Sequence, residues 1–118
     1  MTRRPARTPL PFSLWTVGVI LPSVVWAAAV VVQLTWLPRL PDPIAIHWGS
    51  DGPDGFGAAW TSVALTAGLG VGLTLLFALI LTTARGTSPT VVHKTIAVVS
   101  LGTALFTGIT VSASLGVQ

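Results

Sequence analysis

Three long stretches without any charged side chain limit what this chain can fold into. They cover about residues 14–37, 60–84 and 95–117, and each reaches the length of roughly 20 residues that a helix needs to cross a bilayer. Only 8% of the 118 residues are charged, and the mean hydropathy is +0.83, which is too high for an ordinary soluble domain. We therefore predict an all-α fold, an integral membrane three-helix bundle that forms one membrane domain over residues 1–118.

The first stretch contains a proline, Pro22, inside its apolar run. Proline has no backbone N–H, so the carbonyl one turn earlier loses its usual donor, and in a membrane neighbouring helices or hydroxyls can satisfy that carbonyl. We expect a kink near residues 18–22. A cleaved signal peptide is the alternative interpretation, but the apolar run is longer than the apolar segment of a signal peptide.

The few charges are distributed unevenly between these stretches. The basic residues outside the 38–59 segment are Arg3, Arg4, Arg7, Arg85 and Lys94. The segment 38–59 has one arginine against three aspartates. Short basic segments stay in the cytoplasm, so we expect the N-terminus and the loop 85–94 inside the cell, and residues 38–59 as a 22-residue outer loop of a multi-pass cell-membrane protein. The basic residues form no single patch, and nucleic-acid binding is not expected.

Small residues recur at every fourth position in the second and third stretches. The second stretch has Ala64, Gly68 and Gly72, and the third has Ser100, Ala104, Gly108, Ser112 and Gly116. A face of small residues lets helix backbones approach closely, which favours helix association in lipid. We expect both faces to mediate packing. The partner helix can belong to the same chain or to a second copy in a homo-oligomer.

The most polar part of the chain is the outer loop, with the sequence "HWGSDGPDGFG" at residues 47–57. Just before it, alternation places Ile44, Ile46 and Trp48 on one side of an extended segment, and Ala45 and His47 on the other. That segment is expected to lie on the membrane surface or on the helix ends. Two turn signals follow, Asp51-Gly52 and Pro53-Asp54-Gly55. We predict an ordered loop.

The stretch "LPDPIAIHWGSDGPDGFGAAW" resembles the signature loop of a bacterial membrane-protein family of unknown function. Its pattern, L-P-x-x-I-P-x-H-[FW], follows a first transmembrane helix and also occurs at the N-terminus of SdpI-type immunity proteins. The matching residues here are Leu40, Pro41, Ile44, His47, Trp48, Gly52, Pro53 and Asp54. This chain departs from the pattern at Ala45, Gly49 and Ala59, which replace a proline, an asparagine and a lysine. The resemblance implies a membrane protein with a loop after its first helix, and immunity only in some longer members.

Three interpretations of the loop side chains stay open. His47 can hydrogen-bond the loop backbone or an aspartate and so shape the turn. Together with Asp51 and Asp54 it could form a facial metal site, although this spacing is unspecific. Exposed loops on a rigid frame are also common binding surfaces. The residues of a partner-binding loop would be His47, Trp48, Asp51, Pro53 and Asp54.

The sequence also weighs against several kinds of activity. None of the three apolar stretches contains an ionisable side chain, as a proton-coupled transporter would require. His47 has Ser50 nearby but no recognisable third group to orient a catalytic pair, so we predict no enzyme and no cofactor. We expect an accessory, sensing or immunity-like protein whose partners are the lipid bilayer and an extracytoplasmic protein or peptide. The alternatives are a metal-binding protein and a passive pore.

Overall fold

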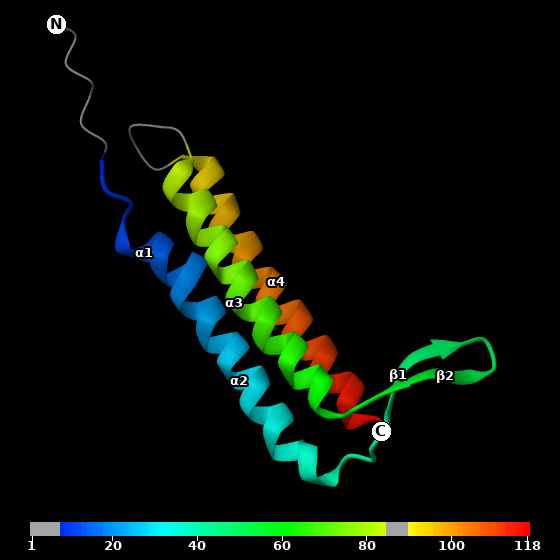
Figure 1. Ribbon diagram of the computed structural model, residues 1–118. Helices are drawn as coiled ribbons and strands as arrows, with labels where there is room; N and C mark the ends of the chain where they lie inside the picture. Colours follow the sequence, from blue (N-terminus) through cyan, green and yellow to red (C-terminus); the bar gives the residue numbers. More distant parts are fainter. Residues whose placement is uncertain (1–7, 85–89) are drawn as a thin grey trace, which may run out of the picture.

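The computed structural model describes residues 8–84 and 90–118, which form three long helices and one β-hairpin (Figure 1). The first helix runs without a break from Phe12 to Arg39. Its consecutive parts are α1 (Phe12–Trp15), the π-helical turn η1 (Thr16–Ile20), α2 (Leu21–Trp36) and the 3-10 turn η2 (Leu37–Arg39). The hairpin consists of β1 (Ile44–Gly49) and β2 (Gly52–Gly57), and the remaining helices are α3 (Trp60–Thr83) and α4 (Val91–Gly116).

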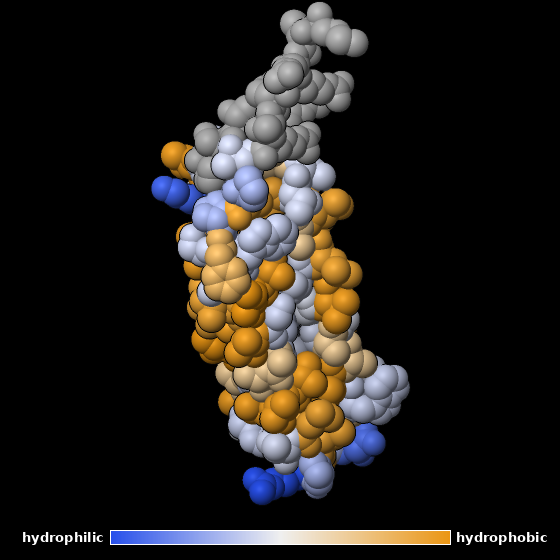
Figure 2. Space-filling view, turned by 90° about the vertical axis from the view of Figure 1, so that its left-hand side faces the viewer, coloured by the Kyte–Doolittle hydropathy of each residue, from blue (hydrophilic) through white to orange (hydrophobic). Residues whose placement is uncertain are grey.

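All three helices are long and apolar enough to cross a membrane, as the three uncharged stretches predict. They lie side by side, with the hairpin at the end where α2 finishes and α3 begins (Figure 1). Figure 2 shows apolar side chains along the length of one face, with the strongly hydrophilic residues at its two ends. α4 begins at Val91, so His93 and Lys94 lie in its first turn.

The prediction of a purely α-helical protein is wrong for the outer loop, which contains a two-stranded antiparallel sheet. Residues 44–48 are mostly β-branched and aromatic, which suits an extended strand. Gly52 has a φ of 122°, a conformation that L residues rarely adopt, so the chain reverses at the expected Asp51-Gly52 signal. The second expected turn, Pro53-Asp54-Gly55, does not form, because one reversal is enough and these residues pair with β1 as part of β2.

Where a kink is expected, around Pro22, the first helix contains the π-helical turn η1. In a regular helix the carbonyl of Gly18 would accept a hydrogen bond from residue 22, and proline cannot donate one. Instead the hydroxyl of Ser100 in α4 donates to the Gly18 oxygen over 2.7 Å. A hydroxyl from a neighbouring helix therefore satisfies the carbonyl that the proline leaves free, as predicted.

Two further contacts hold the first helix to α3. Gln33 and Thr66 are both almost fully buried, and the Gln33 amide donates to the Thr66 hydroxyl over 3.0 Å. One turn along α3, the indole of Trp26 lies directly on Gly70, where a Cβ atom would be only 2.8 Å from the Trp26 Cγ. The hydrophobic effect does not drive helices together in lipid, so hydrogen bonds and close packing of the backbones hold these two helices together.

Candidate functional site

The base of the hairpin is fixed to the ends of the helices by a small hydrophobic cluster. Ile44 at the start of β1 is fully buried, and it packs with Ala59 just before α3 and Leu115 near the end of α4. The partly buried side chains of Trp36, Leu37 and Leu40 surround this cluster. The first strand is therefore anchored to all three helices, so the hairpin starts from a rigid base.

A second anchor comes from the side chain of Gln118, which follows α4. Its amide oxygen accepts from the Ala45 backbone N–H over 3.1 Å, and its amide nitrogen donates to the Ala45 carbonyl over 3.2 Å. The same nitrogen lies 3.2 Å from the Ser114 carbonyl oxygen. Gln118 thus pairs with Ala45 as the backbone of an additional strand would, and ties β1 to the end of α4.

His47 and Asp54 face each other across the two strands. The His47 Nδ1 atom and the Asp54 Oδ1 atom are within hydrogen-bonding distance, and both side chains are largely exposed, at 72% and 54%. Glycines make this contact possible, because a Cβ at Gly49 would lie 2.6 Å from Asp54 Oδ2 and one at Gly55 would lie 2.9 Å from His47 Cβ. This is the interpretation in which His47 bonds an aspartate and shapes the loop.

The opposite side of β1 faces the helices. Ile44, Ile46 and Trp48 line one side of a small cavity of about 220 Å³. Ala45, which the alternation places on the other side, lines this cavity too, because the register of β1 is irregular between Ala45 and Trp48. The other walls of this cavity come from Ser62, Leu65, Thr66, Leu69, Val111, Ser114 and Leu115. Trp48 and Ile46 are still about half exposed, at 48% and 56%. The apolar side chains of β1 therefore face the helices across this cavity. His47 does not line the cavity.

The three residues considered as metal ligands do not come together. Asp54 is close to His47, whereas Asp51 lies in the turn at the tip of the hairpin. Within residues 8–84 and 90–118, no three His, Cys, Asp or Glu side chains are grouped as metal ligands would be. The structure therefore does not assemble the facial site, and Asp51 and Pro53 stand as exposed residues of the hairpin.

Two features of the surface were not identified from the sequence. Phe56 in β2 is 59% exposed and pairs with Ala45, and its position next to glycines gave no pattern to interpret. The pairing of Gln118 with a residue 73 positions earlier depends on the packing of α4 and has no local sequence signal. Gly49 leaves room for the Asp54 carboxylate, because a Cβ at this position would lie 2.6 Å from Asp54 Oδ2.

The two predicted packing faces differ in their surroundings. On α4, Ala104 and Gly108 are buried, and the Cβ position of Gly108 lies 3.5 Å from Ala29 of α2, while Ser112 is half-buried. On α3, Ala64, Gly68 and Gly72 are exposed, and nothing in the described part of the chain lies within 4 Å of a Cβ at either glycine. The α4 face packs inside the chain, and the α3 face is free for another helix.

These features define a protein with three helices of membrane-spanning length and a β-hairpin fixed to one end of the bundle. Residues 24–71 match the family model described as "Domain of unknown function (DUF1648)". The matched segment starts within α2, includes the whole hairpin and ends within α3, so the candidate site lies inside the region similar to that family. Neither the curated proteins nor the solved structures gave a significant match.

Proposed function

We propose that this chain is a non-enzymatic, multi-pass membrane protein of accessory, sensing or immunity-like type, which engages an extracytoplasmic protein or peptide through its hairpin. The observation that carries this proposal is the contrast between the base of the hairpin and the rest of it. The base, at Ile44, is fully buried among the helix ends, whereas His47 of β1 and Asp54 and Phe56 of β2 are exposed. Rigid frames that present exposed side chains are common binding surfaces.

The exposed residues have the composition of a recognition surface. Phe56 and Trp48 offer large aromatic area, which dominates the energy of many protein interfaces. His47 and Asp54 add hydrogen-bonding groups that already hold each other in a defined geometry. A binder whose side chains are held in place loses less conformational entropy on association, which favours affinity.

The orientation in the membrane is part of the proposal and is supported by the charges. Lys94 lies at the end of the bundle opposite the hairpin, and the hairpin itself carries Asp51 and Asp54 (Figure 1). Basic residues favour the cytoplasmic side, which leaves the hairpin outside. The N-terminal arginines and Arg85, which also support this orientation, lie outside the described residues.

Orientation is tested with single cysteines, because the natural sequence has none. In intact cells, a membrane-impermeant maleimide should label Ser50→Cys and should label Thr87→Cys only after the cells are opened. Labelling of Thr87→Cys but not Ser50→Cys in intact cells would show that the hairpin is cytoplasmic.

Partner binding is tested by introducing a photo-crosslinking phenylalanine analogue at position 56 in living cells. The matched control is position 106, because Phe106 is also an exposed phenylalanine but lies within the membrane-spanning part of α4. We expect a discrete protein adduct at position 56 only, and its loss when His47→Ala is added. The hairpin would be excluded as the binding surface if the crosslinker at position 56 gave no adduct beyond that at position 106, whether the hairpin was otherwise wild type or carried His47→Ala or Trp48→Ala.

A further inference from the structure

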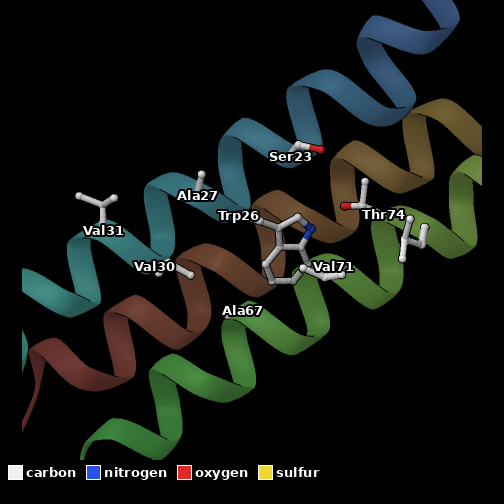
Figure 3. Close-up of a pocket in the computed structure, with 10 residues that line it drawn as sticks. Ser23, Trp26, Ala27, Val30, Val31, Ala67, Val71 and Thr74 are labelled. Carbon is white, nitrogen blue, oxygen red and sulfur yellow. The ribbon is translucent and has the colours of Figure 1, made fainter.

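A second surface lies between α2 and α3 (Figure 3). The two helices form a groove with a volume of about 510 Å³. Small and aliphatic side chains provide most of its walls, namely Ala27, Val30, Val31, Ala67, Val71 and Leu75. In a membrane such a groove is filled either by lipid chains or by another helix.

Two polar groups at this groove have no hydrogen-bond partner among the described residues. The first is the indole N–H of Trp26, a residue that lines the groove and is only 5% exposed. No described side-chain nitrogen or oxygen is both fully buried and unpaired, so this N–H opens onto the groove. The hydroxyl of Thr74, which also lines the groove, likewise makes no hydrogen bond within the described residues. The other hydroxyl at the groove, that of Ser23, donates to the Val19 carbonyl over 2.7 Å.

The depth of Trp26 restricts what can satisfy it. Trp26 lies near the middle of the helix Phe12–Arg39, so its indole is close to the centre of the span. Water is absent at that depth, so a hydrogen-bond donor without an acceptor is strongly unfavourable there. Lipid tails offer no hydrogen-bond acceptor. The occupant of the groove must therefore present an acceptor at mid-membrane, as a protein helix can.

The surface beside the groove has complementary projections and hollows. Val71 and Leu75 project from α3 and are 64% and 65% exposed. Next to them, Gly68 and Gly72 leave open space within 4 Å of where a Cβ would be. Only 11% of the apolar window of α3 is buried, against 28% for the first helix and 22% for α4, so α3 has the largest unpartnered face.

We propose that a second copy of this chain occupies the groove, in a parallel dimer whose two-fold axis runs along the membrane normal. In such a dimer each residue lies at the same membrane depth as the same residue of the second copy. The interface uses the same surface of both copies, so this surface must be complementary to itself. The projections Val71 and Leu75 of one copy fit the hollows at Gly68 and Gly72 of the other. The Trp26 N–H then donates to the Thr74 hydroxyl oxygen of the second copy.

The arrangement is tested by disulfide formation between single cysteines in native membranes. Val71→Cys and Leu75→Cys lie at the groove and should give a covalent dimer under mild oxidation. Phe106→Cys is the control, because Phe106 is 74% exposed on α4 and lies away from the groove. Crosslinking at position 106 as efficient as that at position 71 would overturn the proposed interface.

The strength of association is tested by energy transfer between labelled copies in liposomes, over a series of protein-to-lipid ratios. Gly72→Leu fills an open hollow, since its Cβ would have no atom of another helix within 4 Å, so it should abolish the dimer and leave the protein folded. Trp26→Phe keeps a ring over Gly70 but removes the N–H. It should weaken the association about ninefold, because the two-fold symmetry removes two interhelical hydrogen bonds, each of which contributes about threefold in a membrane.

Two results would overturn this proposal. The wild-type chain could stay monomeric at every ratio, or Gly72→Leu could dimerise as well as wild type does. Retention of lipid on a monomer, lost in a groove variant and detected by native mass spectrometry, would identify lipid as the occupant instead. These experiments do not involve the hairpin, so the two proposals fail independently.

Discussion

The Ser100 hydroxyl of α4 donates a 2.7 Å hydrogen bond to the Gly18 carbonyl in the π-helical turn of the first helix. Both residues are buried, and Gly18 also packs closely, since a Cβ there would lie 2.7 Å from Leu81 Cδ1. The π-helical turn just before Pro22 is therefore the place where the first helix contacts both α3 and α4. The position of the proline and that of the serine are matched across 82 residues of sequence.

The first prediction concerns this hydrogen bond. Ser100→Ala should lower the free energy of unfolding by about 1 kcal/mol, because a buried carbonyl loses its only polar partner from outside its helix. In a Pro22→Ala background the same substitution should cost less, since residue 22 then has an N–H one turn after Gly18. Denaturant titration in micelles measures both, with Ser114→Ala as control because the Ser114 hydroxyl bonds only the Val111 carbonyl of its own helix. Equal costs in both backgrounds would contradict the explanation.

The second prediction compares two glycines of α3. Gly70→Ala should destabilise the protein by about 1–3 kcal/mol, because the new methyl group would overlap the rigid indole of Trp26. Gly68→Ala should leave the protein at least as stable as wild type, because its Cβ would point into open space and alanine favours a helix more than glycine does. Both variants are compared by the same unfolding titration. A larger loss of unfolding free energy in Gly68→Ala than in Gly70→Ala would contradict the packing of Trp26 on Gly70.

The third prediction concerns the buried Gln33–Thr66 pair. Thr66→Val keeps the shape but removes the hydroxyl to which Gln33 donates, and should cost about 1–3 kcal/mol because a buried amide loses a partner. Adding Gln33→Leu should recover most of that loss, since an apolar pair leaves no buried polar group unsatisfied. The measurement is the free energy of unfolding of Thr66→Val, of Gln33→Leu and of the double variant. Additive losses in the double variant would show that the two side chains do not act as a pair.

The fourth prediction concerns the hairpin. Gly49→Ala should displace the Asp54 carboxylate, because its Cβ would lie 2.6 Å from Asp54 Oδ2, and so break the contact with His47. The imidazole nitrogen resonances of His47 in an NMR spectrum should then shift relative to wild type. The same shift is expected in Asp54→Asn, which also loses the contact. The resonances of His93 serve as an internal reference, since that ring is fixed by hydrogen bonds to Thr90 at the other end of the bundle. Unchanged His47 resonances in Gly49→Ala would contradict the structure of the hairpin.

The sequence by itself determined the number and location of the long helices, because an apolar run of about 20 residues is a local property that needs no partner to be recognised. It also determined that Pro22 would free a carbonyl, and that Ile44, Ile46 and Trp48 would share one side of an extended segment. These inferences use only the chemistry of neighbouring residues and the fixed periods of helix and strand. The balance of charge between the segments predicts an orientation, which the labelling experiment above addresses.

Only the tertiary structure decided which residues meet. It selected Ser100 for the free carbonyl, placed Gln118 against Ala45, and turned the Ala64–Gly68–Gly72 face outward while burying Ala104 and Gly108. It also converted the outer loop into a hairpin in which Asp54 faces His47. The physical reason is that small residues line several faces of these helices, and the rotation of each helix is set by contacts between segments distant in sequence, which no local pattern contains.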